Sequence, residues 1–398
     1  MENVVILSAV RTPIGAFQGA LSSLPAHALG ARALAAAIER AGVAPDAVEQ
    51  VNMGCVLTAG QGQAPARQAA LGAGCPVSTG AITLNKVCGS GMRAAMIAAN
   101  DLRCGDFKLV AAGGMESMSQ APYLAAGVRE GLRLGHGKLL DSTILDGLWD
   151  PYNDIHMGSC AELCAAEYQL GREEQDAYAL ESYRRARAAG ESGAFAAEIV
   201  GVPVAQKGQK KGDPPVPMER DEEPWKVDLG RIASLRPAFQ PKDGTVTAGN
   251  ASKINDGAAA LVLTTAAHAA ALGVRPLARI VAHASLAQRP EWFTTAPVGA
   301  TRAVLARAGL APADIDLWEV NEAFAVVAMA FIRDLGLAPE RVNVHGGAVA
   351  LGHPIGASGA RILVTLVHAL RASGGRLGCA AICIGGGEAT AMVIERID

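Results

Sequence analysis

Aromatic side chains are scarce in this sequence of 398 residues, because Phe, Tyr and Trp make up only 4% of it. Packing must then depend on close approach of backbones, which the 46 glycines permit. An excess of positive charge is also missing, since 38 Asp and Glu residues balance 35 Lys and Arg residues. The sequence therefore has little with which to neutralise a nucleic-acid backbone or an anionic membrane. With 50% apolar residues it can bury a large core, which excludes fibrous and disordered classes and favours a small-molecule enzyme.

No apolar run is long enough to cross a membrane, since the longest, residues 258–274, falls short of the ~20 residues that a span needs. The amino terminus leads from Met1 into the short apolar run 4–10, so we expect no targeting signal. The eight cysteines form no Cys-x-x-Cys pairs, and the chain is too long for a disulfide scaffold. We therefore expect free thiols in a reducing, cytoplasmic setting.

Short β-rich runs alternate with longer helical stretches, which is the pattern of an α/β protein. The expected strands are residues 4–10, 108–112, 260–264, 279–283 and 379–384. This alternation predicts a mostly parallel topology.

An internal repeat indicates that the chain contains a duplicated half. The motif Ala-Gly-Val-Ala-Pro around Gly42 recurs as Ala-Gly-Leu-Ala-Pro around Gly309, and Ser90-Gly91 recurs as Ser358-Gly359. The offsets of 267 and 268 residues agree within one, which coincidence would rarely preserve.

The expected helices at 92–102 and 360–370 are apolar around most of their circumference, so they should be buried on all sides. We therefore predict a duplicated five-layer α-β-α-β-α fold with these two helices in the middle. The expected half-domains are residues 1–119 with 250–272, and residues 273–398. Residues 120–249 form an inserted loop domain, in which the charged run 207–211 is interpreted as a solvated turn.

Cys88 stands just before the first buried helix, where helix N–H groups and the helix dipole favour a reactive thiolate. The alternative is a small buried hydrophobe, which most cysteines are. His353 stands before the repeated helix, held between glycines and Pro354. Because the duplication should bring the two helix starts together, the pair predicts a thiol nucleophile activated by histidine.

A dinucleotide-binding site is a competing interpretation of the same region. Residues 89–94 match the pattern G-x-G-x-x-A, and Glu116 follows the next expected strand, as a ribose-binding acid would. However, residues 83–86 make a poor buried strand, and the pattern belongs near the first strand of such a fold. A nicotinamide dehydrogenase is therefore disfavoured.

Two further segments carry candidate residues. Cys383 ends an apolar strand and opens into Ile-Gly-Gly-Gly, where Gly385 could expose a backbone N–H group to an oxyanion. Asn321 lies where a strand should run into a helix, so it could cap the helix or hold a catalytic water.

Four motifs together resemble the thiolase family. They are Asn-Lys-Val-Cys-Gly-Ser-Gly at 85–91, Asn-Glu-Ala-Phe at 321–324, Gly-His-Pro-Ile-Gly at 352–356 and Cys-Ile-Gly-Gly-Gly at 383–387. The resemblance implies that Cys88 takes the acyl group, that His353 accepts its proton and that Cys383 removes the α-proton of a second acyl-CoA. It also implies two oxyanion holes, one from His353 with a water on Asn321, and one from the N–H groups of Cys88 and Gly385.

The resemblance extends to the substrate pocket. The His-Met-Gly of residues 156–158 is similar to the segment that narrows the acyl pocket of short-chain thiolases, through His156 and Met157. The resemblance further implies that Ser252 contacts the pantetheine part of CoA, and that Phe239 and Phe324 line the channel that holds it. The family's arginine against adenine is missing from residues 222–226, where Trp225 is the hypothetical stacking partner. Packing or turn roles are the ordinary alternatives for these residues.

These implications describe an acetyl-CoA C-acetyltransferase that condenses two acetyl-CoA molecules to acetoacetyl-CoA and CoA, reversibly. A broader-chain 3-ketoacyl-CoA thiolase of degradation is the alternative. A ketoacyl synthase is disfavoured by Cys383, and a non-catalytic acyl-CoA carrier would need none of the three reactive residues. The family implies no metal or redox cofactor, no nucleic-acid or membrane partner, and a homotetramer built as a dimer of dimers.

Overall fold

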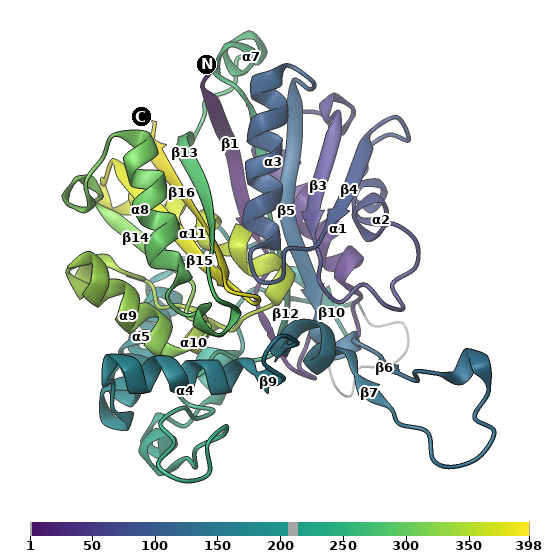
Figure 1. Ribbon diagram of the computed structural model, residues 1–398. Coiled ribbons are helices and arrows are strands. Elements are labelled where there is room, and N and C mark those ends of the chain that lie inside the picture. The colour runs from purple at the N-terminus through teal and green to yellow at the C-terminus, as the bar shows by residue number, and fades with distance from the viewer. Residues whose placement is uncertain (1, 206–213, 398) are drawn as a thin grey trace.

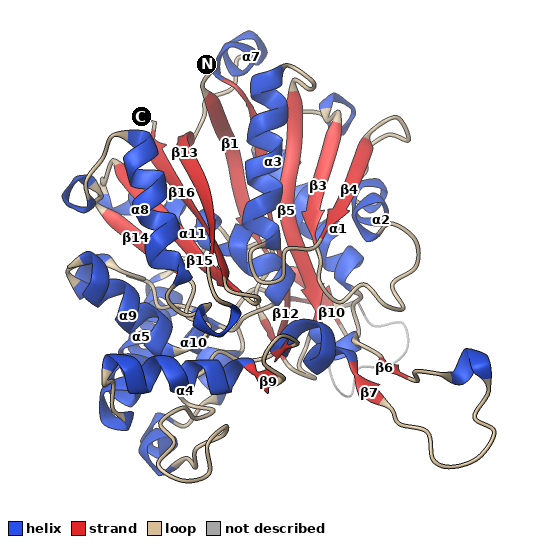
Figure 2. Ribbon diagram, in the orientation of Figure 1, coloured by secondary structure: helices blue, strands red, loops and turns tan. Residues whose placement is uncertain are grey.

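A computed structural model describes residues 2–205 and 214–397 of the chain (Figure 1). The charged run at 207–211 lies outside the described residues. Helices and strands fill most of the chain (Figure 2). In the described part, no helix combines the length and apolarity that a membrane span requires.

The main strands form one hydrogen-bonded path across the molecule, with the short strand β2 (Gly15–Ala16) paired to one of them. In spatial order they are β14 (Leu317–Val320), β15 (Leu377–Ile384), β16 (Glu388–Arg396), β13 (Ala278–Ala287), β1 (Val4–Arg11), β12 (Asn255–Thr265), β5 (Leu109–Ser117), β3 (Gln50–Gly54) and β4 (Gly80–Leu84). The two halves of this path meet where β1 pairs with β13, through only two residue pairs.

The expectation of a mostly parallel topology is wrong. β3 is parallel to β4 and β5, and β14 to β15, whereas the long pairings of β12 with β1 and β5, and of β16 with β13 and β15, are antiparallel. Both halves contain four strands paired in the same order: antiparallel, antiparallel, then parallel. The strands β1, β12, β5 and β3 of the first half therefore correspond to β13, β16, β15 and β14 of the second. This correspondence is the structural form of the sequence repeat.

Helices cover both faces of each half and fill the space between them. The middle layer consists of α3 (Ser90–Cys104) and α11 (Ile355–Ser373), which contact each other and strands of both halves. The outer layers are α1 (Ala26–Arg40) with α2 (Pro65–Gly72), and α8 (Ala296–Ala308) with α9 (Ala325–Leu335). The predicted five-layer arrangement is therefore confirmed.

Two glycines related by the repeat allow the middle helices to touch. A Cβ atom on Gly91 would lie 2.7 Å from the backbone nitrogen of Ala360, and one on Gly359 would lie 2.5 Å from that of Met92. Any larger side chain would push the helices apart, because real Cβ atoms do not approach backbone so closely. The close crossing puts the amino-terminal ends of α3 and α11 beside each other.

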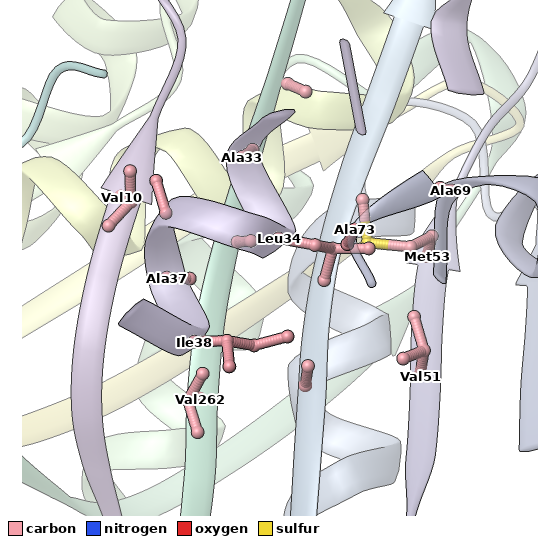
Figure 3. Packing of buried hydrophobic residues seen from close by; sticks show 14 of the residues in the cluster. Val10, Ala33, Leu34, Ala37, Ile38, Val51, Met53, Ala69, Ala73 and Val262 are labelled. Atoms are coloured by element: carbon pink, nitrogen blue, oxygen red, sulfur yellow. The ribbon is translucent and has the colours of Figure 1, made fainter. Parts of the chain in front are cut away.

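The outer layer of the first half shows why a chain poor in aromatics still packs well. Leu34 and Ile38 of α1 belong to one buried cluster with Val10, Val51 and other aliphatic side chains of the sheet, part of which Figure 3 shows. All four side chains are buried, and each contributes about 1.5–3 kcal/mol of transfer free energy. Small residues of α1 bring its backbone close to the strands.

Residues between β5 and β12 form the wall on which the site is built. They include α4 (Met157–Tyr168), α5 (Arg172–Ser192) and α6 (Glu223–Lys226), together with the short pairs β8 (Trp149–Asp150) with β9 (Ile155–His156) and β10 (Val202–Val204) with β11 (Val216–Met218). A hairpin of β6 (Tyr123–Leu124) and β7 (Leu140–Asp141) projects away from the body at the lower right of Figure 1.

Candidate active site

Cys88 lies in the turn between β4 and α3, in a strained backbone setting. Val87, the residue before it, has φ +45°, a left-handed conformation that a β-branched side chain rarely adopts. The hydroxyl of Ser90 holds this turn by donating to the Val87 carbonyl (2.6 Å) and accepting from the Lys86 N–H group (2.8 Å). The turn thus fixes where the thiol points.

The Cys88 turn packs directly on the end of β15 from the other half. A Cβ atom on Gly89 would lie 2.3 Å from the Cδ1 atom of Ile384. Lys86 also forms an ion pair with Glu388, at the start of β16. The two loops that carry Cys88 and Gly385 therefore lie in contact.

The protein around Cys88 makes its thiol harder, not easier, to ionise. Although the side chain is only partly buried, desolvation raises the pKa of Cys88 to about 12, and hydrogen bonds from the N–H groups of Gly385 and Cys88 offset only part of this rise. The helix-end N–H groups expected to favour the thiolate do act in that direction, but burial outweighs them. The neutral thiol needs a base.

His353 is held so that one ring nitrogen faces the cavity. Its backbone N–H group donates to Asn255 Oδ1 (2.9 Å), and its Nδ1 atom lies 2.6 Å from Ser358 Oγ. The Ser358 hydroxyl donates its single proton to the Pro354 carbonyl (2.9 Å), so Ser358 accepts the proton of Nδ1. Nε2 is then the unprotonated nitrogen, and among the described residues it has no hydrogen-bond partner.

Burial, followed by the positive charge of Arg361, lowers the pKa of His353 to about 3. The ring is therefore neutral near pH 7, with Nε2 free to take a proton. This is the state that a general base requires.

Cys383 lies in β15 behind the pocket wall, fully buried among Met157, Phe324 and other apolar side chains. Burial raises the pKa of its thiol well above the ordinary value, and charge on Cys88 raises it further. The two thiols are thus close enough to sense each other's ionisation. All eight cysteines fall in the described part of the chain, and each is a free thiol.

Asn321 follows β14 and is fully buried, yet its side-chain amide nitrogen and oxygen have no partner among the described residues. Such a group normally finds a partner in the protein or in an ordered water. It does not cap the helix that follows, because α9 begins at Ala325 after an N-cap at Phe324. The alternative of a helix cap is excluded, and a water-binding amide fits the geometry.

These segments surround a single cavity of about 580 Å³. It is lined by eight of the ten residues that the sequence singled out, Cys88, His353, Gly385, His156, Met157, Ser252, Phe239 and Phe324. Asn321 and Cys383 are buried and are not among the lining residues. The cavity volume is that of a site for an elongated small molecule.

One part of the cavity has a tightly packed aromatic wall. The Nδ1 atom of His156 accepts the Gly158 N–H group (3.0 Å) and so caps α4. The His156 ring stacks on Phe239 with centroids 4.7 Å apart, and Phe239 meets Phe324 edge-on at 6.1 Å. A Cβ atom on Gly158 would lie 2.3 Å from the Phe239 ring, so the wall is too tightly packed for a side chain at this position.

The loop that carries Ser252 is tied down by carboxylates of the inserted segment. Glu162 of α4 accepts the N–H groups of Thr245 and Val246 (both 2.9 Å). The Ser252 N–H group donates to the Ala323 carbonyl (3.0 Å). Hydrogen bonds within the protein therefore hold the loop.

Two lining residues were not expected from the sequence, and one expected residue lies elsewhere. Lys226 and Lys253 line the cavity, although nothing in their sequence context signalled it. Trp225 lies elsewhere, on a smaller cavity, with the Arg220 guanidinium stacked 3.1 Å from its ring centroid. The structure therefore does not support Trp225 as an adenine platform.

Glu116 is not available to a ribose. It is buried, and backbone N–H groups of Val56, Leu57 and Gly356 surround its carboxylate. This removes the main support for the dinucleotide alternative. Within the described residues, no three His, Cys, Asp or Glu side chains gather in an arrangement suited to a metal ion.

Comparison with known proteins covers the whole chain. The family models for the thiolase N-terminal domain and the thiolase C-terminal domain match residues 4–267 and 274–396. Acetyl-CoA acetyltransferase 2 from Arabidopsis thaliana is 53% identical over 99% of this chain and 97% of its own length. The mitochondrial acetyl-CoA acetyltransferase from Bos taurus is 53% identical over 100% of this chain and 92% of its own. A crystal structure of Acat5 thiolase from Ascaris suum in complex with coenzyme A is 44% identical, with a TM-score of 0.94 over all of both chains.

The expectation of a cytoplasmic protein is wrong by this comparison. Relatives from Xenopus tropicalis, Bos taurus and Mus musculus are named as mitochondrial enzymes. The reason for the error is physical, because unpaired cysteines report a reducing environment and do not distinguish one reducing compartment from another.

Proposed function

Because this chain belongs to the thiolase family, we propose that it is an acetyl-CoA acetyltransferase working through an acyl-Cys88 intermediate. It joins two acetyl-CoA molecules into acetoacetyl-CoA and releases CoA, and the reaction runs in reverse as thiolysis. The observation that carries the proposal is the shared cavity, in which Cys88, the free Nε2 atom of His353 and the N–H group of Gly385 meet.

In the first half-reaction, Nε2 of His353 takes the proton of Cys88, and the sulfur attacks the thioester carbonyl of acetyl-CoA. The N–H groups of Cys88 and Gly385 stabilise the oxyanion of the tetrahedral intermediate. CoA leaves as a thiolate and takes the proton of Cys383. Acylation removes the charge on Cys88 that opposes ionisation of Cys383, so it favours formation of the second thiolate.

In the second half-reaction, the Cys383 thiolate removes an α-proton from a second acetyl-CoA. The protonated His353 and a water held by Asn321 stabilise the enolate oxygen. The enolate carbon attacks acetyl-Cys88, the C–S bond breaks, and the released Cys88 thiolate recovers its proton from His353. Both thiols return to their starting state, so the protons balance.

Two variants test the division of work between the thiols. Cys88→Ala should lose both acetyl labelling by acetyl-CoA and turnover, whereas labelling of Cys88 should survive in Cys383→Ala while condensation is lost. Condensation by Cys383→Ala at the wild-type rate would overturn the role of the second thiol.

The substrate assignment rests on the packed wall of His156, Met157 and Phe239. CoA-dependent cleavage of acetoacetyl-CoA should exceed that of a longer 3-ketoacyl-CoA. Equal kcat/KM for both would favour the broader-chain thiolase of degradation.

The projecting hairpin supports a homotetramer. Its side chains include Leu134, Leu139 and Tyr123, which are 99%, 70% and 63% exposed. Exposed apolar side chains of this kind mark contact surfaces between proteins. The mass of the protein in solution should be four times that of one chain, and Leu134→Asp should lower it.

A further inference from the structure

Glu116 is a buried carboxylate near the site that the reaction steps above do not use. It lies one residue before the end of β5 and is fully buried. Its Oε2 atom accepts the N–H groups of Val56 (3.0 Å) and Gly356 (2.8 Å), and its Oε1 atom accepts that of Leu57 (3.1 Å). The thiol of Cys55 contacts Oε1 at 3.6 Å. The carboxylate therefore joins three chain segments.

One of these segments is the first turn of α11, which holds His353. Gly356 is the second residue of that helix, where N–H groups have no partner within the helix and attract an anion. The bonds from His353 to Ser358 and from Ser358 to the Pro354 carbonyl lie in the same turn. A shift of this turn would therefore move Nε2 relative to the Cys88 sulfur.

The turn packs so closely on Glu116 and β5 that two positions, Gly356 and Gly114, have no room for a side chain. A Cβ atom on Gly356 would lie 2.6 Å from Glu116 Oε2, and one on Gly114 of β5 would lie 2.0 Å from the Gly356 carbonyl oxygen. The helix end thus rests directly on the strand, with the carboxylate as its polar anchor.

The second segment reaches the wall of the acyl site. Val56 and Leu57 pack against Met118 and Ile355, two residues that line the cavity, and Cys88 lies at the edge of the same cluster. Glu116 therefore holds the helix start and the loop beneath the nucleophile at once.

We propose that Glu116 is a positioning residue that keeps Nε2 of His353 within proton-transfer distance of Cys88. The proposal rests on the proposed function, since it assumes that this pair performs acylation. Glu116 touches no substrate and acts through the α11 turn and the loop 55–57. Its charge also raises the pKa of the Cys88 thiol, so loss of the charge alone would make alkylation faster, and a slower alkylation reports positioning.

The test compares Glu116→Gln with Glu116→Asp. A glutamine can accept from Val56 and Gly356 through its oxygen, but its NH₂ group then faces the Leu57 N–H group. In Glu116→Gln, kcat for acetoacetyl-CoA thiolysis and the rate of Cys88 alkylation by iodoacetamide should both fall about 10- to 100-fold, with KM unchanged. Glu116→Asp keeps the carboxyl group and should recover part of this loss. If Glu116→Gln does not fold, the same fall in kcat without a change in KM is expected, to a smaller degree, for Glu116→Asp.

Glu162→Gln is the matched control, because it also removes one buried carboxylate that accepts backbone N–H groups. It holds the Ser252 loop, so it should raise KM for CoA and leave the alkylation rate of Cys88 unchanged. Wild-type kcat and alkylation in a folded Glu116 variant would overturn the positioning role and leave the proposed function intact. A wild-type enzyme that forms no acetyl-Cys88 would instead refute the proposed function itself.

Discussion

The Nδ1 atom of His353 lies 2.6 Å from the Oγ atom of Ser358, and the Ser358 hydroxyl donates its proton to the Pro354 carbonyl. This chain of two bonds fixes the imidazole tautomer as well as its orientation. In the proposed mechanism Cys88 and Cys383 supply the reactive sulfur atoms, and Ser358, one turn into α11, determines which nitrogen of His353 faces them.

Ser358→Ala should remove this control. The Nδ1–H group would lose its acceptor, and the population of rings with a free Nε2 would fall. We expect kcat to drop about 10- to 100-fold with little change in KM. Ser358→Thr keeps a hydroxyl and is the control, since it should retain more activity than the alanine variant. Equal rates for alanine and wild type in steady-state thiolysis would rule out tautomer control.

Met157→Ala should widen the acyl end of the cavity. Met157 is buried beside Gly385. A Cβ atom added to Gly385 would lie 3.6 Å from the Met157 sulfur. We expect kcat/KM for a longer 3-ketoacyl-CoA to rise roughly tenfold relative to acetoacetyl-CoA, the scale of one or two methylene groups in an apolar pocket. Parallel assays of the two substrates measure the ratio, and an unchanged ratio would place the length limit elsewhere.

Glu319 and Arg361 form a buried ion pair at 3.2 Å between β14 and α11. Burial raises the pKa of Glu319, and the charge of Arg361 opposes that rise. Glu319→Gln should lower the free energy of unfolding by about 3–5 kcal/mol, because it leaves the guanidinium buried without a counter-ion. The double change Glu319→Leu with Arg361→Met should cost less than the sum of the two single changes. Urea unfolding of the wild type, Glu319→Leu, Arg361→Met and the double variant gives the coupling energy, and additive effects would mean that the pair does not interact.

His283 should make the fold sensitive to acid. Burial, then the charges of Arg103, Arg307 and Arg93, lowers its pKa to about 4 from the ordinary 6.5. The unfolded chain therefore binds more protons than the folded one between these values, so stability is lost as pH falls from 6.5 to 4.

Removing His283 tests this loss. We expect His283→Asn to reduce the difference in unfolding free energy between pH 7 and pH 4.5 by roughly 2 kcal/mol, allowing for solvent screening. Asn100, which also contacts the ring, provides the control Asn100→Ala, in which the pH dependence should persist. A pH dependence unchanged by His283→Asn would assign the acid sensitivity to other groups.

The middle layer could be predicted from the sequence because local composition determines it. Residues 92–102 and 360–370 carry apolar side chains on all sides, and the structure extends them to α3 and α11. The direction of strand pairing could not be predicted in this way. An apolar run such as 279–283 indicates a strand, but its partner, β16, lies more than a hundred residues away, and the run does not encode which neighbour it meets.

The same distinction applies to the site. Cys88 and His353 stand beside glycines and Pro354 in a repeat, so their convergence could be inferred from symmetry. The pKa of Cys88 could not, because it depends on how completely apolar chains from the other half desolvate the sulfur. Glu116 gave only a misleading signal, since its partners come from residues 55–57 and 356, far apart in sequence.

The place of Cys383 and Gly385 in the second half of the fold has a consequence for the first half. Without β15, Cys88 lacks the N–H group of Gly385 that faces its sulfur and the neighbouring Cys383 thiol. Under the proposed mechanism, a chain cut before β15 would be inert toward acetyl transfer even where its first half had folded.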